Sequence, residues 1–143
     1  MPNSDSEFTG SIPGNYDRIL GPMLFQPYAE DMAPRVAALS PQALLETAAG
    51  TGIVTMQLAS SLPASTKIVA TDLNQAMIDA AAAKPAPRPI TWQACDATQL
   101  PYDDRTFDCV VCQFGVMFFP SQLTGYQEAF RVLKPGGHYL FSV

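Results

Sequence analysis

Hydrophobic and polar positions follow two patterns that take turns along the chain, and they predict alternating strands and helices. Short apolar runs, which are typical of buried strands, lie at 44–45, 67–72, 90–96, 107–113 and 138–143. The intervening segments with the length and composition of helices lie at 53–62, 75–84 and 121–133. Strands that alternate with helices form βαβ units, so we expect a parallel sheet with right-handed crossovers.

The first 40 residues have a different pattern. Residues 1–14 are polar, with two prolines and two glycines, and indicate a loosely packed lead-in. A short helix is expected over 15–22, and in 23–39 apolar side chains recur every four residues. Pro34 lies inside this second pattern and should kink or restart the helix. We therefore expect short cap helices over a sheet or ligand pocket in 1–40, and the main domain in 41–143.

A turn of small residues joins the first strand to the next helix. The segment Leu44–Gly52 reads LLETAAGTG, with an acidic residue, a small residue and two glycines spaced at Glu46, Ala48, Gly50 and Gly52. Glycines allow a tight turn and a close ligand approach, and a helix start offers free N–H groups. Ala48 stands where such turns often have a first glycine. It costs little if its φ is negative, although it narrows the space for a ligand.

Two later strands end in a carboxylate, at Asp72 and Asp96. Ligands of open parallel sheets bind beyond the carboxyl ends of the strands, so these side chains and residues 113–115 should line one crevice with the glycine turn. Asp72 follows Gly52 by 20 residues (72 − 52), where a ribose-binding acid belongs in a Rossmann-type site. Each aspartate alone is equally well explained as a loop cap. Up to this point NAD and S-adenosylmethionine fit equally well.

Three further motifs separate these cofactors. CDATQLPYD at 95–103 resembles the D-A-x-x-L-P-F/Y motif of class I S-adenosylmethionine-dependent methyltransferases, FDCVVCQFG at 107–115 resembles their fourth strand, and RVLKPGG at 131–137 resembles the turn before their fifth. The chain from about Tyr16 to its end is therefore identified as a member of the UbiE-like family. The resemblance implies a Rossmann-like α/β three-layer sandwich with a mostly parallel sheet of strand order 3-2-1-4-5.

The resemblance also implies transfer of a methyl group from S-adenosylmethionine to a small-molecule acceptor, with S-adenosylhomocysteine as product. Glu46 would lie near the amino group of the cofactor, Asp72 would bind its ribose, and Asp96 its adenine amino group. The implied cofactor-binding residues are Glu46, Thr47, Ala48, Ala49, Gly50, Gly52, Asp72, Leu73, Met77, Asp96, Ala97, Gln113 and Phe114. Tyr16, Phe25 and Tyr28 would close the pocket from the N-terminal side.

No residue can be named as a catalytic base. The single histidine, His138, follows a Gly-Gly turn, where a solvated or structural role is favoured. The pair Cys109 and Cys112 has the C-x-x-C form, but in a strand these residues point to opposite faces about 10 Å apart. A disulfide and a zinc site are both disfavoured, and buried reduced thiols are expected.

Charge and composition exclude several partners. The formal net charge is −5, from 8 Lys+Arg and 13 Asp+Glu, with no basic cluster, which disfavours nucleic acid and anionic membrane surfaces. The N-terminus lacks a signal-peptide pattern and no apolar stretch reaches the ~20 residues of a membrane span, so a cytoplasmic protein is expected.

The sequence stops at the fifth strand, whereas the family fold has seven. Strand five would then be an apolar edge that invites pairing. Either strands six and seven have been lost by truncation, or a partner chain covers the edge, a homodimer being one arrangement. The alternatives to an active methyltransferase are a non-catalytic module that binds S-adenosylmethionine or a partner, and an NAD-dependent oxidoreductase, for which no hydride-transfer signature such as Tyr-x-x-x-Lys is present.

Overall fold

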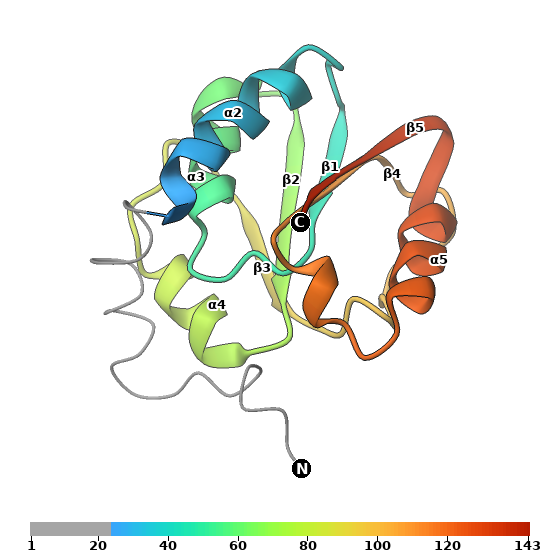
Figure 1. The fold of residues 1–143 in the computed structure, drawn as a ribbon. Coiled ribbons are helices and arrows are strands. Elements are labelled where there is room, and N and C mark those ends of the chain that lie inside the picture. Colours follow the sequence, from blue (N-terminus) through green and yellow to red (C-terminus); the bar gives the residue numbers. More distant parts are fainter. Residues whose placement is uncertain (1–23) are drawn as a thin grey trace.

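The computed structural model describes residues 24–143, which form a five-stranded parallel sheet between two layers of helices (Figure 1). The strands are β1 (Ala43–Glu46), β2 (Lys67–Asp72), β3 (Thr91–Ala94), β4 (Phe107–Gln113) and β5 (Leu133–Ser142). The helices are α2 (Gln26–Ala37), α3 (Ile53–Ser61), α4 (Gln75–Ala82), the short 3-10 helix η3 (Val116–Phe118) and α5 (Gln122–Val132). The sheet order is β3-β2-β1-β4-β5, as predicted.

Both faces of the sheet are buried, which explains why its central strands read as continuous apolar runs. Leu44, Ile68 and Val111 pack on one face against α2 and α3. Leu45, Val69 and Val110 alternate with them and pack on the other face against α5. Figure 1 shows α2, α3 and α4 together on one side of the sheet and α5 on the opposite side. The predicted three-layer sandwich is confirmed.

Caps and turns define where the helices begin. The side chain of Asn74 accepts hydrogen bonds from the backbone N–H groups of Ala76 and Met77, so Asn74 is the N-cap of α4. Ser121 accepts from the N–H of Thr124 at the start of α5. The helix α3 has no side-chain cap and follows Gly52 directly. Its first N–H groups therefore lie at the glycine turn.

Two elements differ from the prediction. The helix α2 is not restarted at Pro34 but runs through it, because its buried face (Ala29, Met32, Ala33 and Val36) packs continuously. The expected turn at 134–137 instead belongs to β5, which begins directly after α5. Phe107 pairs with Leu133 and Cys109 with His138, so β5 carries extra residues in a bulge that includes Gly136, at φ 80°. The helix expected over 15–22 lies outside the described residues.

Two further observations concern membrane-spanning helices and the cysteine thiols. Within residues 24–143, every helix is too short or too polar to cross a bilayer. Cys95, Cys109 and Cys112 are free, and the last two are buried. Burial raises the pKa of the Cys109 thiol to about 12 and that of Cys112 to about 11. Both thiols are therefore protonated at neutral pH.

Candidate functional site

The glycine turn is anchored between the two strands that flank β1. The backbone N–H of Thr47 donates to the carbonyl of Val111 on β4 at 2.9 Å, and the N–H of Ala49 donates to the carbonyl of Thr71 on β2 at 2.8 Å. The sheet order places β1 between these strands, so the turn is held from both sides at the carboxyl end of the sheet. Open parallel sheets bind their ligands at the carboxyl ends of the strands.

Three residues of the turn adopt left-handed backbone conformations. Gly50 has φ 58° and Gly52 has φ 87°, which explains the need for glycine at both positions. A Cβ on Gly52 would come within 2.9 Å of the Trp92 ring, whereas one on Gly50 would meet nothing within 4 Å. Ala48 has φ 53°, so the negative φ that would have made alanine inexpensive there is absent. Its backbone is strained, because β-carbons disfavour this region.

The loop after β4 packs tightly against the turn. A Cβ built on Gly115 would overlap the Cβ of Ala48 and come within 2.9 Å of the Cys112 sulfur. The preceding residue, Phe114, also has a positive φ, of 54°. Strained backbone of this kind concentrates at binding sites, where the surrounding structure holds it in place.

Asp72 ties the end of β2 to the glycine turn. Its Oδ2 accepts a hydrogen bond of 2.9 Å from the N–H of Gly50, and its Oδ1 accepts one of 2.9 Å from the N–H of Asn74. Burial raises the pKa of this carboxyl, and the two backbone hydrogen bonds act in the opposite direction. The structure therefore brings Asp72 and Gly50 together, as the sequence predicted, and gives the carboxylate a loop-capping role as well.

Asp96 has the loop-capping role that was the alternative for each aspartate. Its Oδ1 accepts hydrogen bonds from the N–H of Thr98 at 2.8 Å and from the Thr98 hydroxyl at 2.6 Å. The residue is exposed, and Ala97 beside it is half-buried. Both follow β3, which pairs with β2, so they lie at the same end of the sheet as Asp72.

Glu46 is fully buried at the start of the turn, with 1% of its surface exposed. The hydroxyl of Thr55, on the first turn of α3, donates a hydrogen bond to its Oε1. Burial raises the pKa of the carboxyl to about 8, so the acid form predominates at neutral pH. Thr55 is not among the site residues predicted from the sequence. The sequence does place a hydroxyl residue three positions after Gly52, among the apolar residues at the start of α3. The structure shows that this face of the helix is buried.

The N-terminal end of α2 covers the end of β4. The Gln113 side-chain amide donates to the carbonyl of Phe25 at 3.2 Å, and the Tyr28 ring meets Phe114 edge-on with ring centres 4.8 Å apart. Phe25 and Tyr28 thus lie beside the crevice, while Tyr16 is outside the described residues. The buried Oε1 of Gln113 accepts no hydrogen bond from any residue of 24–143. A ligand donor would satisfy it.

Two other residues predicted to bind the cofactor, Leu73 and Met77, differ in their exposure. Leu73 follows Asp72 and is 57% exposed, so it is accessible to a flat apolar ligand group. Met77 is only 4% exposed, because α4 turns it inward together with Ile78 and Ala81. Its side chain therefore lies under the helix rather than open to the crevice. No group of three His, Cys, Asp or Glu side chains suitable for a metal occurs between residues 24 and 143.

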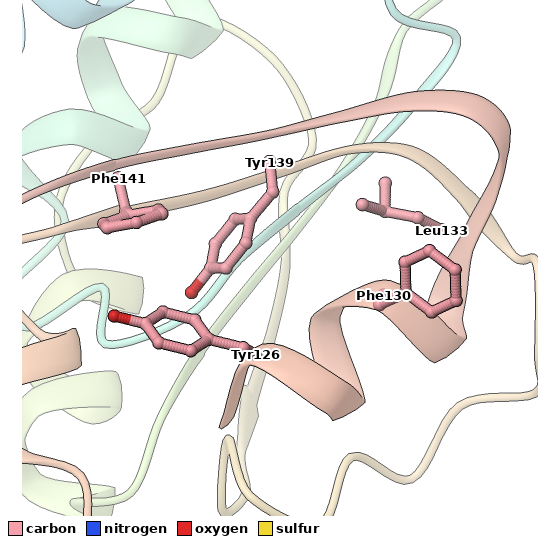
Figure 2. A pocket seen from close by; sticks show the side chains of 5 residues that line it. All are labelled: Tyr126, Phe130, Leu133, Tyr139 and Phe141. Atoms are coloured by element: carbon pink, nitrogen blue, oxygen red, sulfur yellow. The ribbon is translucent and has the colours of Figure 1, made fainter. Parts of the chain in front are cut away.

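A second concave region lies away from the turn, between α5 and the outer strand β5. It is a hollow of about 400 Å³ lined by Tyr126, Phe130, Leu133, Tyr139 and Phe141. Figure 2 shows Tyr126 on α5 turned toward Tyr139 and Phe141 on β5. Phe130 is 81% exposed and Phe141 42%. The side chains that line the hollow offer mainly apolar and aromatic contact area.

Comparisons with known proteins agree with this geometry. A family profile described as a methyltransferase domain matches residues 44–137. A demethylmenaquinone methyltransferase of Deinococcus radiodurans is 34% identical over 92% of this chain and 56% of its own length. A ubiquinone/menaquinone biosynthesis C-methyltransferase UbiE of Bartonella quintana is 33% identical over 91% of this chain and 54% of its own. The chain thus spans about half the length of these curated relatives.

The solved structures show the same fold. One, described as a proposed S-adenosyl-L-methionine-dependent methyltransferase of Methanococcus maripaludis, superposes with a TM-score of 0.80. The match covers 96% of this chain and 66% of that one, at 23% identity. At this identity the likeness concerns the fold.

Proposed function

The chain belongs to the UbiE-like family of class I S-adenosylmethionine-dependent methyltransferases, and on this premise we propose that it binds S-adenosylmethionine and transfers its methyl group to a small-molecule acceptor. One observation carries the proposal. The N–H of Gly50, in the glycine turn, donates to the carboxylate of Asp72 at the end of the neighbouring strand. This hydrogen bond holds the glycine turn next to the acid that we propose for ribose binding.

The residues present suit this cofactor. Gly50 faces open space, so a ligand can lie against the turn. Gln113 offers a buried amide oxygen that no described residue satisfies, at the end of β4. Asp72 supplies an acceptor for ribose hydroxyls, and exposed Leu73 beside it supplies an apolar contact for adenine. The protein thus supplies hydrogen-bond acceptors, and the hydroxyl and amino groups of the cofactor are hydrogen-bond donors.

When bound, S-adenosylmethionine supplies an electrophilic methyl group on a sulfonium centre. The chain contributes position: the turn 47–52 holds the amino-acid part, and Asp72 the ribose. Phe114, which is held by contacts with Phe25 and Tyr28, excludes water beside β4. Orientation and desolvation of this kind supply a large part of such rate enhancements. An acceptor that must lose a proton needs a base in addition.

The acceptor belongs to the proposal as well. The two curated relatives are named as methyltransferases of demethylmenaquinone and of ubiquinone and menaquinone biosynthesis. The aromatic rings of Phe25, Tyr28 and Phe114 near the end of β4 suit a flat apolar acceptor of that class. A cytoplasmic location stays a prediction.

Calorimetric titration with S-adenosylhomocysteine, with NAD in parallel, tests cofactor choice. We expect micromolar binding of the former alone and loss of at least tenfold in affinity in Asp72→Asn. Asp79→Asn, the same change at an exposed aspartate of α4, is the matched control and should bind normally. Binding of NAD alone would refute the proposal.

A radiolabelled methyl-transfer assay with quinone-ring acceptors then separates an enzyme from a binding module. Turnover that is lost in Asp72→Asn and retained in Asp79→Asn supports the methyltransferase. Tight cofactor binding without transfer to any acceptor would favour the non-catalytic module.

We further propose that a second copy of this chain covers the β5 edge. Two β5 strands pairing across a twofold axis would satisfy their outer backbone groups and bury both aromatic hollows. Light scattering should then give twice the chain mass, and Phe130→Ser should yield monomers. Leu123→Ser, at another exposed position of α5 that does not line the hollow, should leave the dimer intact. A monomer at all concentrations would refute this arrangement.

A further inference from the structure

We propose that Glu46 is a neutral acid in the free protein and releases its proton when a cationic amino group occupies the glycine turn, with Thr55 positioning the carboxyl for this exchange. The inference deepens the proposed function, on which it rests, because S-adenosylmethionine and S-adenosylhomocysteine carry an ammonium on their amino-acid part. It makes cofactor binding a proton-linked reaction.

The geometry fixes Glu46 in an enclosed site. Glu46 is 1% exposed and Thr55 is fully buried, so neither side chain reaches bulk water. The Thr55 hydroxyl donates to Oε1 of Glu46, and the Thr71 hydroxyl donates to the backbone carbonyl of Glu46 at 2.9 Å. Side chain and backbone are therefore both held, one from α3 and the other from β2.

No cation of residues 24–143 neutralises this carboxyl. The ion pairs formed there involve the carboxylates of Asp31, Asp104 and Glu128. A buried carboxylate without a positive partner is costly, so the site favours the neutral acid. An ammonium that enters the turn would remove this cost by supplying the missing charge.

The groups that surround Glu46 affect its protonation in different ways. Asp72 on β2 adds negative charge near Glu46 and disfavours a second carboxylate. Cys112 on β4 also faces Glu46, but its pKa of about 11 keeps it neutral below pH 9. From α3 the neighbour is the uncharged Thr55, whose hydrogen bond favours the ionised form. Desolvation outweighs that hydrogen bond and raises the pKa of Glu46 to about 8.

Binding of the ligand changes the protonation of Glu46 alone. The ligand keeps its ammonium proton, Glu46 loses its carboxyl proton to the buffer, and a carboxylate–ammonium pair replaces the neutral acid. Each proton released makes affinity rise by at most tenfold per pH unit below the pKa of the free carboxyl. Affinity for S-adenosylhomocysteine should therefore increase from pH 6 to about 8 and then level off.

Calorimetric titration of S-adenosylhomocysteine at pH 7, in buffers of different ionisation enthalpy, counts the protons. We expect release of close to one proton at pH 7 and close to none at pH 9. Glu46→Gln should abolish the release. Glu30→Gln, the same change at an exposed glutamate of α2, should retain it. Absence of release in the native chain, or equal release in Glu46→Gln, would overturn the inference.

Two substitutions test the role of Thr55. Thr55→Ser keeps the hydroxyl, whereas Thr55→Val keeps the shape and removes it. Because the lost hydrogen bond favoured the charged carboxylate, Thr55→Val should shift the rise in affinity to higher pH, while Thr55→Ser should follow the native profile. Identical pH profiles for Thr55→Val and the native chain would show that Thr55 does not position Glu46.

Unfolding of the ligand-free chain by urea between pH 5 and 9 gives an independent readout. In the folded state the pKa of Glu46 is about 8, above its ordinary value of 4.5. The contribution of Glu46 to folding stability is therefore full below pH 4.5 and is lost as the pH rises through 8. This loss should be absent in Glu46→Gln and present in Glu30→Gln. A loss equal in all three proteins would overturn the neutral acid. If S-adenosylhomocysteine binds without proton release, only the inference fails; if it does not bind at any pH, the proposed function fails too.

Discussion

The contact between Ala48 and Gly115 yields a prediction whose size follows from the structure. Gly115 has an ordinary φ of −110°, so alanine is acceptable there as far as the backbone is concerned. The obstacle is space, because the new Cβ would overlap the Cβ of Ala48 and crowd the Cys112 sulfur. In the folded state, Gly115→Ala therefore changes mainly the packing between the glycine turn and the β4 loop.

The expected free-energy changes can be worked out for each variant. Overpacking of this kind costs roughly 1–3 kcal/mol, so we take about 2 kcal/mol for Gly115→Ala. Ala48→Gly removes left-handed strain of about 1–2 kcal/mol but loosens the unfolded chain by about 0.4–1 kcal/mol. The net effect is a stabilisation of about 0–1.6 kcal/mol. In the Ala48→Gly background one of the two crowded atoms is absent, so Gly115→Ala should cost only about 1 kcal/mol.

Urea unfolding of the native chain, the two single variants and the double variant measures this coupling as a double-mutant cycle. Ala48→Gly should recover about 1 kcal/mol of the loss caused by Gly115→Ala. Effects that add to within about 0.3 kcal/mol would refute it, because independent sites behave in that way. Destabilisation by Ala48→Gly alone would contradict the strained conformation of Ala48.

Three further predictions concern other parts of the fold. Arg131→Met should lower the stability by about 1–2 kcal/mol and speed amide exchange in 100–105, because the guanidinium donates to the carbonyls of Leu100 and Tyr102 at 2.9 and 2.7 Å. Unchanged amide exchange in residues 100–105 would show that these Arg131 hydrogen bonds do not hold the segment. Asp108→Ala should cost about 2 kcal/mol in urea unfolding, since its carboxylate accepts from the N–H groups of Gln42 and Ala43 at 2.8 and 3.0 Å. A thiol reagent at pH 7 should modify half-buried Cys95 first, and Cys95→Ser should leave only the slow reaction of Cys109 and Cys112. Fast modification of two thiols in that variant would disprove their burial.

Local patterns predicted the strands and the position of the glycine turn, whereas the strand order followed from the family resemblance. Apolar runs followed by Glu46, Asp72 and Asp96 indicated where strands end, because a parallel sheet imposes that arrangement on its carboxyl edge. The cap at Asn74 was predictable for the same reason, since it depends on its own neighbours. These features need little knowledge of the rest of the chain.

The features that escaped prediction depend on contacts between distant segments. The sign of φ at Ala48 is set by the anchoring of Thr47 on β4 and Ala49 on β2. The continuity of α2 through Pro34 is set by burial against α3 and the sheet. Likewise, the Glu46–Thr55 hydrogen bond spans strand, turn and helix. A sequence pattern does not encode such distances, so these details required the structure.

The central position of β1 has a consequence for how the protein becomes able to bind anything. β1 pairs with β2 through residues that lie 24 positions apart in the sequence, such as Ala43 and Lys67 (67 − 43). On its other side β1 pairs with β4, where Leu44 and Cys109 lie 65 positions apart (109 − 44). Closing so long a loop carries a larger entropy cost, and such long-range pairing slows folding. Because Thr47 and Ala48 take their positions from β4 and its loop, a chain emerging from the ribosome has no finished turn until β4 has inserted. A ligand that binds at this turn, as proposed, would therefore report completed folding, because it would stabilise only molecules in which β4 is in place.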